Sequence, residues 1–248
     1  MTRIIAIANH KGGVGKTTSA ASIGSCLAGK GFKTLLIDLD GQANLTSYFF
    51  LEEDEDRNSV FDTLVNDTAL PIYSIKENLD MVPSSLEMAG AEVAMTNIVA
   101  REQLLNIALK PIKANYDYIL IDCPPSIGIV TTNAFLAATE ILVPMTPELL
   151  PLKGMSMLES FVESLRRIKP ELKINGVFIT RFNNRKLNKV VETALKEMYS
   201  DITYQTKIRE NISGAESAGS GSSIFEYDTE SNGAKDYAAL TEEIIAKI

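Results

Sequence analysis

The stretch IAIANHKGGVGKTTSA (Ile5–Ala20) decides the fold of this chain of 248 residues. An apolar run, a glycine-rich turn and an Ala/Ser-rich segment follow one another, which is the order of a strand, a phosphate-binding loop and a helix. Gly12, Gly13 and Gly15 allow backbone N–H groups to approach phosphate oxygens without an obstructing Cβ. Lys16 is then placed to contact the β- and γ-phosphates of a nucleotide. The stretch therefore predicts a nucleotide-binding α/β domain.

The residues around Lys16 include a predicted metal ligand, Thr17, and a second lysine, Lys11, that the usual loop pattern does not contain. Val14 completes the turn, the Thr17 hydroxyl is placed to hold Mg²⁺, and Thr18 can reach the α-phosphate. The start of the following helix adds its dipole and free amides. The loop lacks the first glycine of the usual GxxxxGK[ST] pattern and carries a second lysine, Lys11, near its mouth. A lysine there is expected to point toward a second nucleotide, held by a second copy of the chain.

Apolar runs alternate with amphipathic stretches along the whole sequence. Runs that are apolar on both faces, as here, are typical of parallel strands covered by helices on each side. The sequence therefore predicts a single α/β domain (1–248) with a mostly parallel central sheet flanked by helices on both faces. The predicted strands are 3–8, 33–38, 79–83, 116–122, 140–145 and 174–180, and the predicted helices are 16–29, 97–113, 127–138, 148–168, 184–199 and 233–247.

Composition limits the class of protein and its compartment. No apolar run approaches the roughly 18–20 residues of a membrane span. The first strand begins almost at once, so we expect no signal peptide and a cytoplasmic location. Cys26 and Cys123 lack a CxxC spacing and predict buried thiols, and the single histidine excludes a His-rich metal site. The net charge of −8 is uneven, with an acidic segment at 52–56 that we interpret as a solvated loop.

Three aspartates follow or end predicted strands. Asp38 and Asp40 come after one apolar run, where alternation along an extended chain directs both to the same side. Asp122 ends another run, before Pro124 and Pro125 break the strand. Because parallel strands bring their carboxyl ends to one edge of the sheet, we expect these carboxylates near the phosphate site. They are candidates for holding Mg²⁺ and orienting water.

Four motifs together resemble the ParA-type partition ATPases, which belong to the ParA/MinD class with a deviant phosphate-binding loop. The resemblance covers essentially the whole chain. The motifs are NHKGGVGKTT (9–18), LLIDLDGQANLT (35–46), YDYILIDCPPS (116–126) and TKIRENISGAES (206–217).

This resemblance assigns a role to each candidate residue. It implies that Lys11 crosses a dimer interface to the partner's ATP and that Asp40 orients the attacking water. It further implies that Asp38 lies near the metal and that Asp122 holds Mg²⁺ through water. The adenine pocket is expected at Arg181, Ile208 and Arg209.

The chain departs from the family pattern at several positions. Arg209 and Glu210 stand in the predicted adenine pocket where the family often has Pro and Arg. Gly41 replaces the proline that usually follows the catalytic aspartate, which predicts a looser switch segment. Ser213 and Ser222 stand where relatives commonly carry basic residues, which predicts weaker or differently placed DNA contacts.

Three function classes compete within this superfamily. A carrier of the nitrogenase-iron or Mrp type needs paired cysteines, which Cys26 and Cys123 do not supply. A MinD-like membrane ATPase needs a basic amphipathic tail with large apolar residues, whereas 236–248 has two glutamates, one lysine and no Phe or Trp, and is expected to be a helix packed on the core. We therefore expect a DNA partition ATPase that forms an ATP-dependent homodimer, binds DNA without sequence preference in the nucleoid, and responds to a ParB-like partner rather than a membrane. Candidate DNA contacts are Arg181, Arg185, Lys186, Lys189, Lys207 and Arg209.

Overall fold

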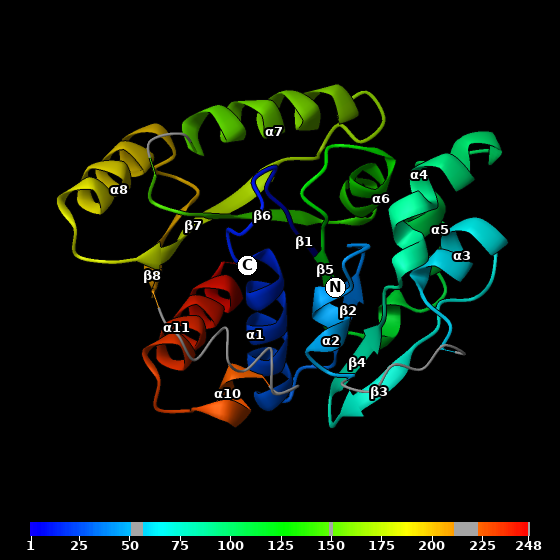
Figure 1. Cartoon of the computed structure of the whole chain (residues 1–248), viewed down its shortest axis with the longest axis horizontal. Helices are drawn as coiled ribbons and strands as arrows, with labels where there is room; N and C mark the ends of the chain where they lie inside the picture. Colours follow the sequence, from blue (N-terminus) through cyan, green and yellow to red (C-terminus); the bar gives the residue numbers. More distant parts are fainter. Residues whose placement is uncertain (51–56, 149–150, 211–222, 248) are drawn as a thin grey trace.

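The computed structural model of the chain describes residues 1–50, 57–148, 151–210 and 223–247. The described strands form one eight-stranded sheet in the order β3-β4-β2-β5-β1-β6-β7-β8 (Figure 1). Neighbouring strands are parallel except for β3, which is antiparallel to β4. The strands are β1 (Arg3–Ile7), β2 (Thr34–Asp38), β3 (Tyr73–Lys76), β4 (Leu79–Val82), β5 (Tyr118–Asp122), β6 (Glu140–Met145), β7 (Ile174–Phe182) and β8 (Thr203–Arg209).

Helices connect most of the parallel strands. The longer ones are α1 (Lys16–Gly29), α6 (Ile129–Ala137), α7 (Pro151–Leu165), α8 (Lys186–Met198) and α11 (Asn232–Ala246). The shorter segments are α2 (Asn44–Ser47), α3 (Val60–Asn66), η1 (Leu86–Gly90), α4 (Ala91–Ala94), η2 (Met95–Asn97), α5 (Leu104–Leu109), η3 (Lys113–Asn115) and α10 (Ile224–Tyr227).

The side chains of β1 alternate between two apolar layers. Ile5 and Ile7 pack into a cluster with residues of α1 and α11 on one face of the sheet. Ile4 and Ala6 pack into a second cluster, to which α5, α6, α7 and α8 contribute. Burial on both faces explains why the strand is apolar at successive positions. The two layers confirm the predicted α/β fold, with helices on both faces of a mostly parallel sheet.

The register of the central strands gathers their carboxyl ends. Ile7 of β1 is the register partner of Asp122 of β5, and Asp122 is the register partner of Asp38 of β2. The loops that leave these three strands therefore meet at one edge of the sheet, as the sequence predicted.

All six predicted strands are present, but the sheet has two further strands, β3 and β8, at its edges. The predicted helix 97–113 is wrong. Only Leu104–Leu109 is α-helical, and Ala100 has a φ of 55°, which no α-helix accommodates. The other five predicted helices correspond to α1, α6, α7, α8 and α11. The acidic segment 52–56, the positions of Ser213 and Ser222, and residues 149–150 of the predicted helix 148–168 lie outside the described residues.

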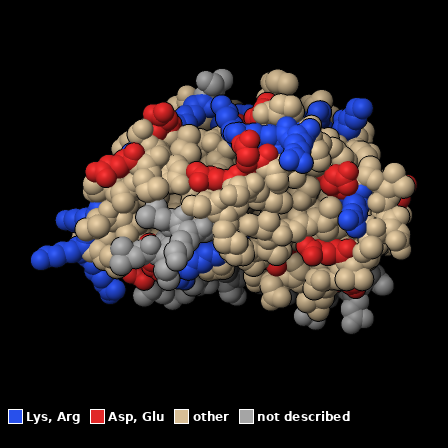
Figure 2. All heavy atoms as spheres, turned by 90° about the horizontal axis from the view of Figure 1, so that it is seen from above, with Lys and Arg blue, Asp and Glu red and all other residues tan. Residues whose placement is uncertain are grey.

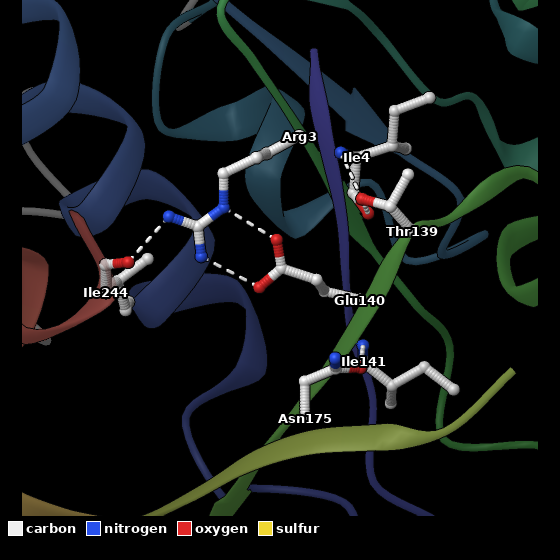
Figure 3. Close-up of polar contacts among 7 residues, drawn as sticks. All are labelled: Arg3, Ile4, Thr139, Glu140, Ile141, Asn175 and Ile244. Carbon is white, nitrogen blue, oxygen red and sulfur yellow. Dashed lines mark hydrogen bonds and ion pairs between the residues drawn. The ribbon is translucent and has the colours of Figure 1, made fainter. Parts of the chain in front are cut away.

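Arg3 connects the C-terminal helix α11 to the amino ends of β1 and β6 (Figure 3). The Arg3 guanidinium donates to both carboxylate oxygens of Glu140, at 2.6 and 2.8 Å, and to the backbone carbonyl of Ile244 in α11 at 2.6 Å. A cation near the last carbonyls of a helix complements the helix dipole. These bonds therefore fix α11 to β1 and β6, away from the loops described below.

Candidate nucleotide-binding site

The glycine-rich loop has the backbone conformation that its sequence predicts. Gly13 and Gly15 have φ values of 72° and 86°, which side chains with a Cβ rarely adopt. Gly15 immediately precedes α1, so Lys16 is the first helical residue, and its side chain is 7% exposed. The Lys16 Nζ lies 3.5 Å from the backbone carbonyl of Lys11, across the loop. The loop thus surrounds a buried ammonium group.

A cavity of about 740 Å³ opens over this loop. Its volume falls within the range of small-molecule sites in proteins. Val14, Lys11, Asp38 and Asp122 are not among its lining residues. The predicted residues that line it are Gly12, Gly13, Gly15, Lys16, Thr17, Thr18, Asp40, Arg181, Ile208 and Arg209. The fold therefore brings four separate segments of the sequence to one concave site.

Two tyrosines form walls of the cavity that the sequence did not indicate. Tyr48, which directly follows α2, donates a hydrogen bond to the Thr18 hydroxyl at 3.1 Å, and Tyr237 of α11 shares one with Ser19 at 3.0 Å. Both rings are nearly fully buried. They tie α2 and α11 to the first turn of α1. No local pattern marks a tyrosine for this role, because the contact depends on packing between distant segments.

The Asp122 carboxylate, at the end of β5, is fully buried. It is 0% exposed, and neither of its oxygens has a hydrogen-bond partner among the described residues. Burial raises the pKa of Asp122 well above its ordinary value, and the nearby Asp38 carboxylate raises it further, although the Thr17 hydroxyl and the Lys16 ammonium act in the opposite direction. A buried acid without partners is costly in free energy unless a cation or proton compensates its charge. With the Thr17 hydroxyl nearby, this orphaned carboxylate fits a Mg²⁺ ion.

No group of three or more His, Cys, Asp or Glu side chains within the described ranges is arranged to hold a metal ion. Mg²⁺ commonly takes only one or two protein ligands and completes its shell with water and phosphate oxygens. A site built from Thr17 and Asp122 therefore agrees with the chemistry of this ion.

Asp38 is equally buried but fully engaged. Its carboxylate accepts hydrogen bonds from the backbone N–H of Asp40 at 3.0 Å and from the N–H and hydroxyl of Thr46 at 2.9 and 2.8 Å. Burial raises the pKa of Asp38 to about 6, although these three hydrogen bonds favour the ionised form. Asp40, two residues further along the chain, lines the cavity.

Lys11 forms an ion pair within its own chain. Its Nζ lies 2.6 Å from Glu148 and 3.5 Å from the Thr146 hydroxyl, both in the segment that follows β6. The Asn9 side chain holds the loop in place by accepting from the Lys11 N–H at 2.9 Å and donating to the Pro144 carbonyl at 2.8 Å. The Lys11 ammonium lowers the pKa of the Glu148 carboxyl. Sequence analysis did not identify this partner.

The predicted adenine residues line the same cavity. Arg181 has a φ of 52°, a conformation that is unfavourable for a side chain with a Cβ and often occurs at functional sites. Its neighbour Thr180 donates to the Val14 carbonyl at 2.8 Å, which connects β7 to the glycine-rich loop. Ile208 is buried, whereas Arg209 makes a bidentate contact with Asp236, with a shortest separation of 2.8 Å.

The six candidate DNA contacts divide into two groups. Lys207 is paired with Glu192 at 2.8 Å and lies over the Phe182 ring, and Arg209 is paired with Asp236. The second group is exposed and forms no ion pair with a described residue; it consists of Arg181, Arg185, Lys186 and Lys189. Basic side chains project at the end of the molecule where α8 lies (left in Figures 1 and 2).

Two other predicted features can be located in the fold. Cys26 lies on α1 and is half-buried, while Cys123 follows β5 and is fully buried. Within the described part of the chain, no helix has both the length and the apolar character needed to cross a membrane.

Comparison with known proteins places this site in a family. Residues 2–174 match the AAA_31 family model, described as an AAA domain. The sporulation initiation inhibitor protein Soj of Bacillus subtilis (strain 168) is 40% identical over 252 residues, covering 99% of each chain. The chromosome partitioning protein ParA of Myxococcus xanthus (strain DK1622) is 36% identical, covering 99% of this chain and 88% of its own. The chain belongs to the ParA-type partition ATPases.

A solved structure supports the same fold for this ParA-type chain. Cobyrinic acid a,c-diamide synthase from Mycobacterium smegmatis, determined with a bound ATP analogue and magnesium, superimposes with a TM-score of 0.85. It is 29% identical, and the match covers 99% of this chain and 95% of that one. The eight-stranded architecture is thus shared with a nucleotide-binding protein.

Proposed function

We propose that this chain is an ATP-dependent dimerising switch, built as one domain, that partitions DNA in the cytoplasm. The observation that carries this proposal is the cavity that joins Lys16, Asp40 and Arg181 from three distant parts of the sequence. Its volume lies in the range of small-molecule sites, and its lining includes the glycine-rich loop and the Lys16 side chain. The M. smegmatis structure, which contains an ATP analogue and magnesium, supports the choice of nucleotide and metal.

The glycine-rich loop binds the phosphates. Lys16 supplies positive charge to the β- and γ-phosphates, the loop amides donate to phosphate oxygens, and Thr18 reaches the α-phosphate. Thr17 and Asp122 hold Mg²⁺, while Asp38 contributes negative charge beside Asp122 with its own oxygens bonded to protein. When bound, Mg²⁺ neutralises charge on the phosphates during transfer. Arg181, Ile208 and Arg209 border the base.

Asp40 carries the chemical step. It lines the same cavity as the glycine-rich loop, so its carboxylate is the candidate to orient the attacking water. A carboxylate that orients water is sufficient, because phosphoryl transfer depends mainly on positioning and on charge stabilisation. ATP turnover in the isolated protein is slow, because a switch has to stay in its ATP-bound state until a ParB-like partner stimulates hydrolysis.

Lys11 serves the second subunit. In the single chain its ammonium is outside the cavity and bound to Glu148, so it does not contact its own nucleotide. Release of this pair would allow Lys11 to reach phosphate across an interface between two copies. ATP would then hold the dimer together.

The ATP dimer binds DNA through the exposed basic residues near the start of α8. Arg185, Lys186 and Lys189 are exposed and are not among the residues that line the cavity. The MinD-like alternative has less support, because the apolar residues Leu240 and Ile244 of the C-terminal helix are buried in the core. The cell's nucleoid is therefore the proposed location, with chromosome or plasmid DNA as the track.

The decisive experiment measures DNA binding at one fixed salt concentration with ATP, with ADP and without nucleotide. Binding that requires ATP, together with an ATP-dependent increase in molar mass by light scattering, supports the switch. A monomer that ignores ATP contradicts it. Protein that ignores DNA but floats with anionic liposomes would instead favour the membrane alternative.

A further inference from the structure

Thr46 is the centre of a buried hydrogen-bonded network behind Asp40. Its backbone N–H and its hydroxyl both donate to Asp38 Oδ2, at 2.9 and 2.8 Å. The other oxygen of Asp38 accepts from the backbone N–H of Asp40 at 3.0 Å. Asp38 therefore connects Thr46 directly to the backbone of the proposed catalytic residue.

Ser84 closes this network from the loop after β4. Its backbone N–H donates to the Thr46 hydroxyl oxygen at 2.9 Å, and its own hydroxyl donates to the Asp40 carbonyl at 2.7 Å. The Thr46 hydroxyl thus donates one hydrogen bond and accepts another. Asp38, Thr46 and Ser84 are 0%, 7% and 6% exposed, so water competes little for these bonds.

The next residue, Gly41, is held by close packing. A Cβ placed on Gly41 would lie 2.7 Å from the backbone nitrogen of Ala89 in η1. No larger side chain fits at that distance without a shift of backbone. The predicted looser switch segment is therefore, in this chain, a segment confined by hydrogen bonds on one side and by η1 on the other.

The Asp40 side chain is oriented locally as well. Its Oδ1 accepts from the backbone N–H of Gln42 at 3.0 Å, which fixes the carboxylate relative to its own turn. The position of that turn in the cavity is then set by the network through its N–H and its carbonyl. Both backbone groups of Asp40 depend on Thr46, one through Asp38 and the other through Ser84.

We propose that Thr46 is a positioning residue for hydrolysis: its hydroxyl links Asp38 to Ser84 and thereby fixes Asp40 at the attacking water. This inference rests on the proposed function of Asp40. Loss of the hydroxyl leaves Asp38 Oδ2 with one donor fewer and the Ser84 N–H without its acceptor. Small displacements of a catalytic group reduce rates strongly, so the chemical step is affected more than nucleotide binding.

The test compares Thr46→Val, which keeps the shape and removes the hydroxyl, with Thr46→Ser, which keeps the hydroxyl. ATP hydrolysis is measured at saturating ATP and Mg²⁺ by release of labelled phosphate, and nucleotide affinity is measured by calorimetry. Thr46→Val should reduce kcat about tenfold to a hundredfold while the dissociation constant for ATP changes less than about threefold. Thr46→Ser should restore turnover to near the wild-type rate.

Thr63→Val is the matched control. Thr63 is a buried threonine of α3 whose hydroxyl donates to the Ala69 carbonyl at 3.2 Å, away from the cavity. This variant should keep the wild-type kcat. If Thr46→Val does not fold, Ser84→Ala removes only the hydrogen bond to the Asp40 carbonyl and should reduce kcat severalfold.

The outcomes separate this inference from the proposed function. If wild-type protein does not hydrolyse ATP, or Asp40→Ala hydrolyses it normally, the role of Asp40 is wrong and the positioning inference is overturned with it. If Asp40 is essential but Thr46→Val and Ser84→Ala turn over at the wild-type rate, only the inference is overturned. Equal losses of kcat and ATP affinity in Thr46→Val, unrescued by Thr46→Ser, would also overturn it, because they indicate general structural damage.

Discussion

Lys11 and Glu148 form an ion pair of 2.6 Å between the glycine-rich loop and the segment after β6. Their side chains are 40% and 55% exposed, so the pair is open to solvent and exchangeable. The same lysine cannot hold Glu148 and a phosphate of a second subunit at once. The intrachain pair therefore competes with the proposed dimer.

Glu148→Gln should strengthen ATP-dependent dimerisation. An exposed pair contributes roughly 0.2–1 kcal/mol, and two such pairs open per dimer, which corresponds to a dimer about two- to thirtyfold tighter. Light scattering over a range of protein concentrations with ATP and Mg²⁺ measures the effect. Glu163→Gln is the control, because it removes the same charge and another exposed pair, with Arg166 at 2.6 Å. Unchanged or weaker dimerisation of Glu148→Gln would rule out competition.

Alanine substitutions of the two loop lysines should impair different properties: ATP binding for Lys16 and dimerisation for Lys11. Lys16→Ala deletes a buried charge in the cavity and should weaken ATP binding about ten- to a hundredfold, the magnitude expected for charge-assisted hydrogen bonds. Lys11→Ala should bind ATP nearly as wild type does but remain monomeric and inactive. Calorimetry with Mg²⁺ and light scattering distinguish the two. A Lys11→Ala protein that dimerises normally would exclude a role across the interface.

Asp40→Ala should separate binding from chemistry. Without an oriented water, turnover should fall a hundredfold or more, within the range for a positioned acid or base, and the ATP dimer should accumulate. Wild-type turnover should itself lie well below the ~10 s⁻¹ median of enzymes. Phosphate release and molar mass are measured on the same samples. Wild-type hydrolysis by Asp40→Ala would move the catalytic role to another residue.

The sequence was sufficient to predict the strands that are apolar at nearly every position and the loop whose residues form one continuous motif. It missed β8, where TYQTKIR has only two apolar residues, Tyr204 and Ile208, because an edge strand is partly exposed. It joined residues 97–113 into one helix because apolar spacing alone does not reveal the positive φ at Ala100.

Within the site, the loop, Asp40 and the residues of β7 and β8 converge on the predicted edge of the sheet. The partners that depend on tertiary packing were not predictable. Glu148, Tyr48 and Ser84 lie far along the sequence from the groups they contact, and only the fold brings them together. Sequence motifs identify groups that carry chemistry, whereas the groups that hold them are recognised from their contacts.

The buried Asp38–Asp122 pair should make stability depend on pH and metal. Both pKa values are raised, that of Asp38 to about 6, so the folded state binds protons more tightly than the unfolded chain. Stability of the nucleotide-free protein should therefore decrease as pH rises from about 4 through the folded pKa values. Asp122→Asn should raise stability at pH 7–8 by about 1–3 kcal/mol, an increase in Tm of roughly 2–12 °C.

Thermal unfolding from pH 5 to pH 8, with and without ATP and Mg²⁺, tests this expectation. The advantage of Asp122→Asn should shrink at pH 5, where protonation already relieves the wild-type pair. The variant should also lose the extra stabilisation that Mg²⁺ gives to the nucleotide complex. A variant less stable than wild type at pH 8 would show that Asp122 is compensated in the folded protein.

DNA binding should reside in three exposed residues at the start of α8. Arg185, Lys186 and Lys189 are free of ion pairs within the described residues, whereas Lys207 and Arg209 are held by Glu192 and Asp236. Because the chain carries a net charge of −8, one subunit offers few phosphate contacts and its remaining surface repels the DNA backbone. Two subunits joined by ATP double the contacts, and each neutralised phosphate steepens the log–log salt dependence by about 0.9.

Binding should therefore require ATP, collapse between low and moderate salt, and be independent of DNA sequence. Replacing all three residues with alanine should abolish binding while ATP affinity stays unchanged, since none of them lines the cavity. The matched control replaces Arg166, Arg167 and Lys173, which follow α7, with alanine and so removes the same charge elsewhere. Fluorescence anisotropy with two unrelated duplexes over a salt series measures all three proteins. Because the control and the triple variant have the same net charge, a selective loss in the triple variant can only come from where its charges lie. Equal losses in both would mean that net charge, rather than the α8 surface, governs DNA binding.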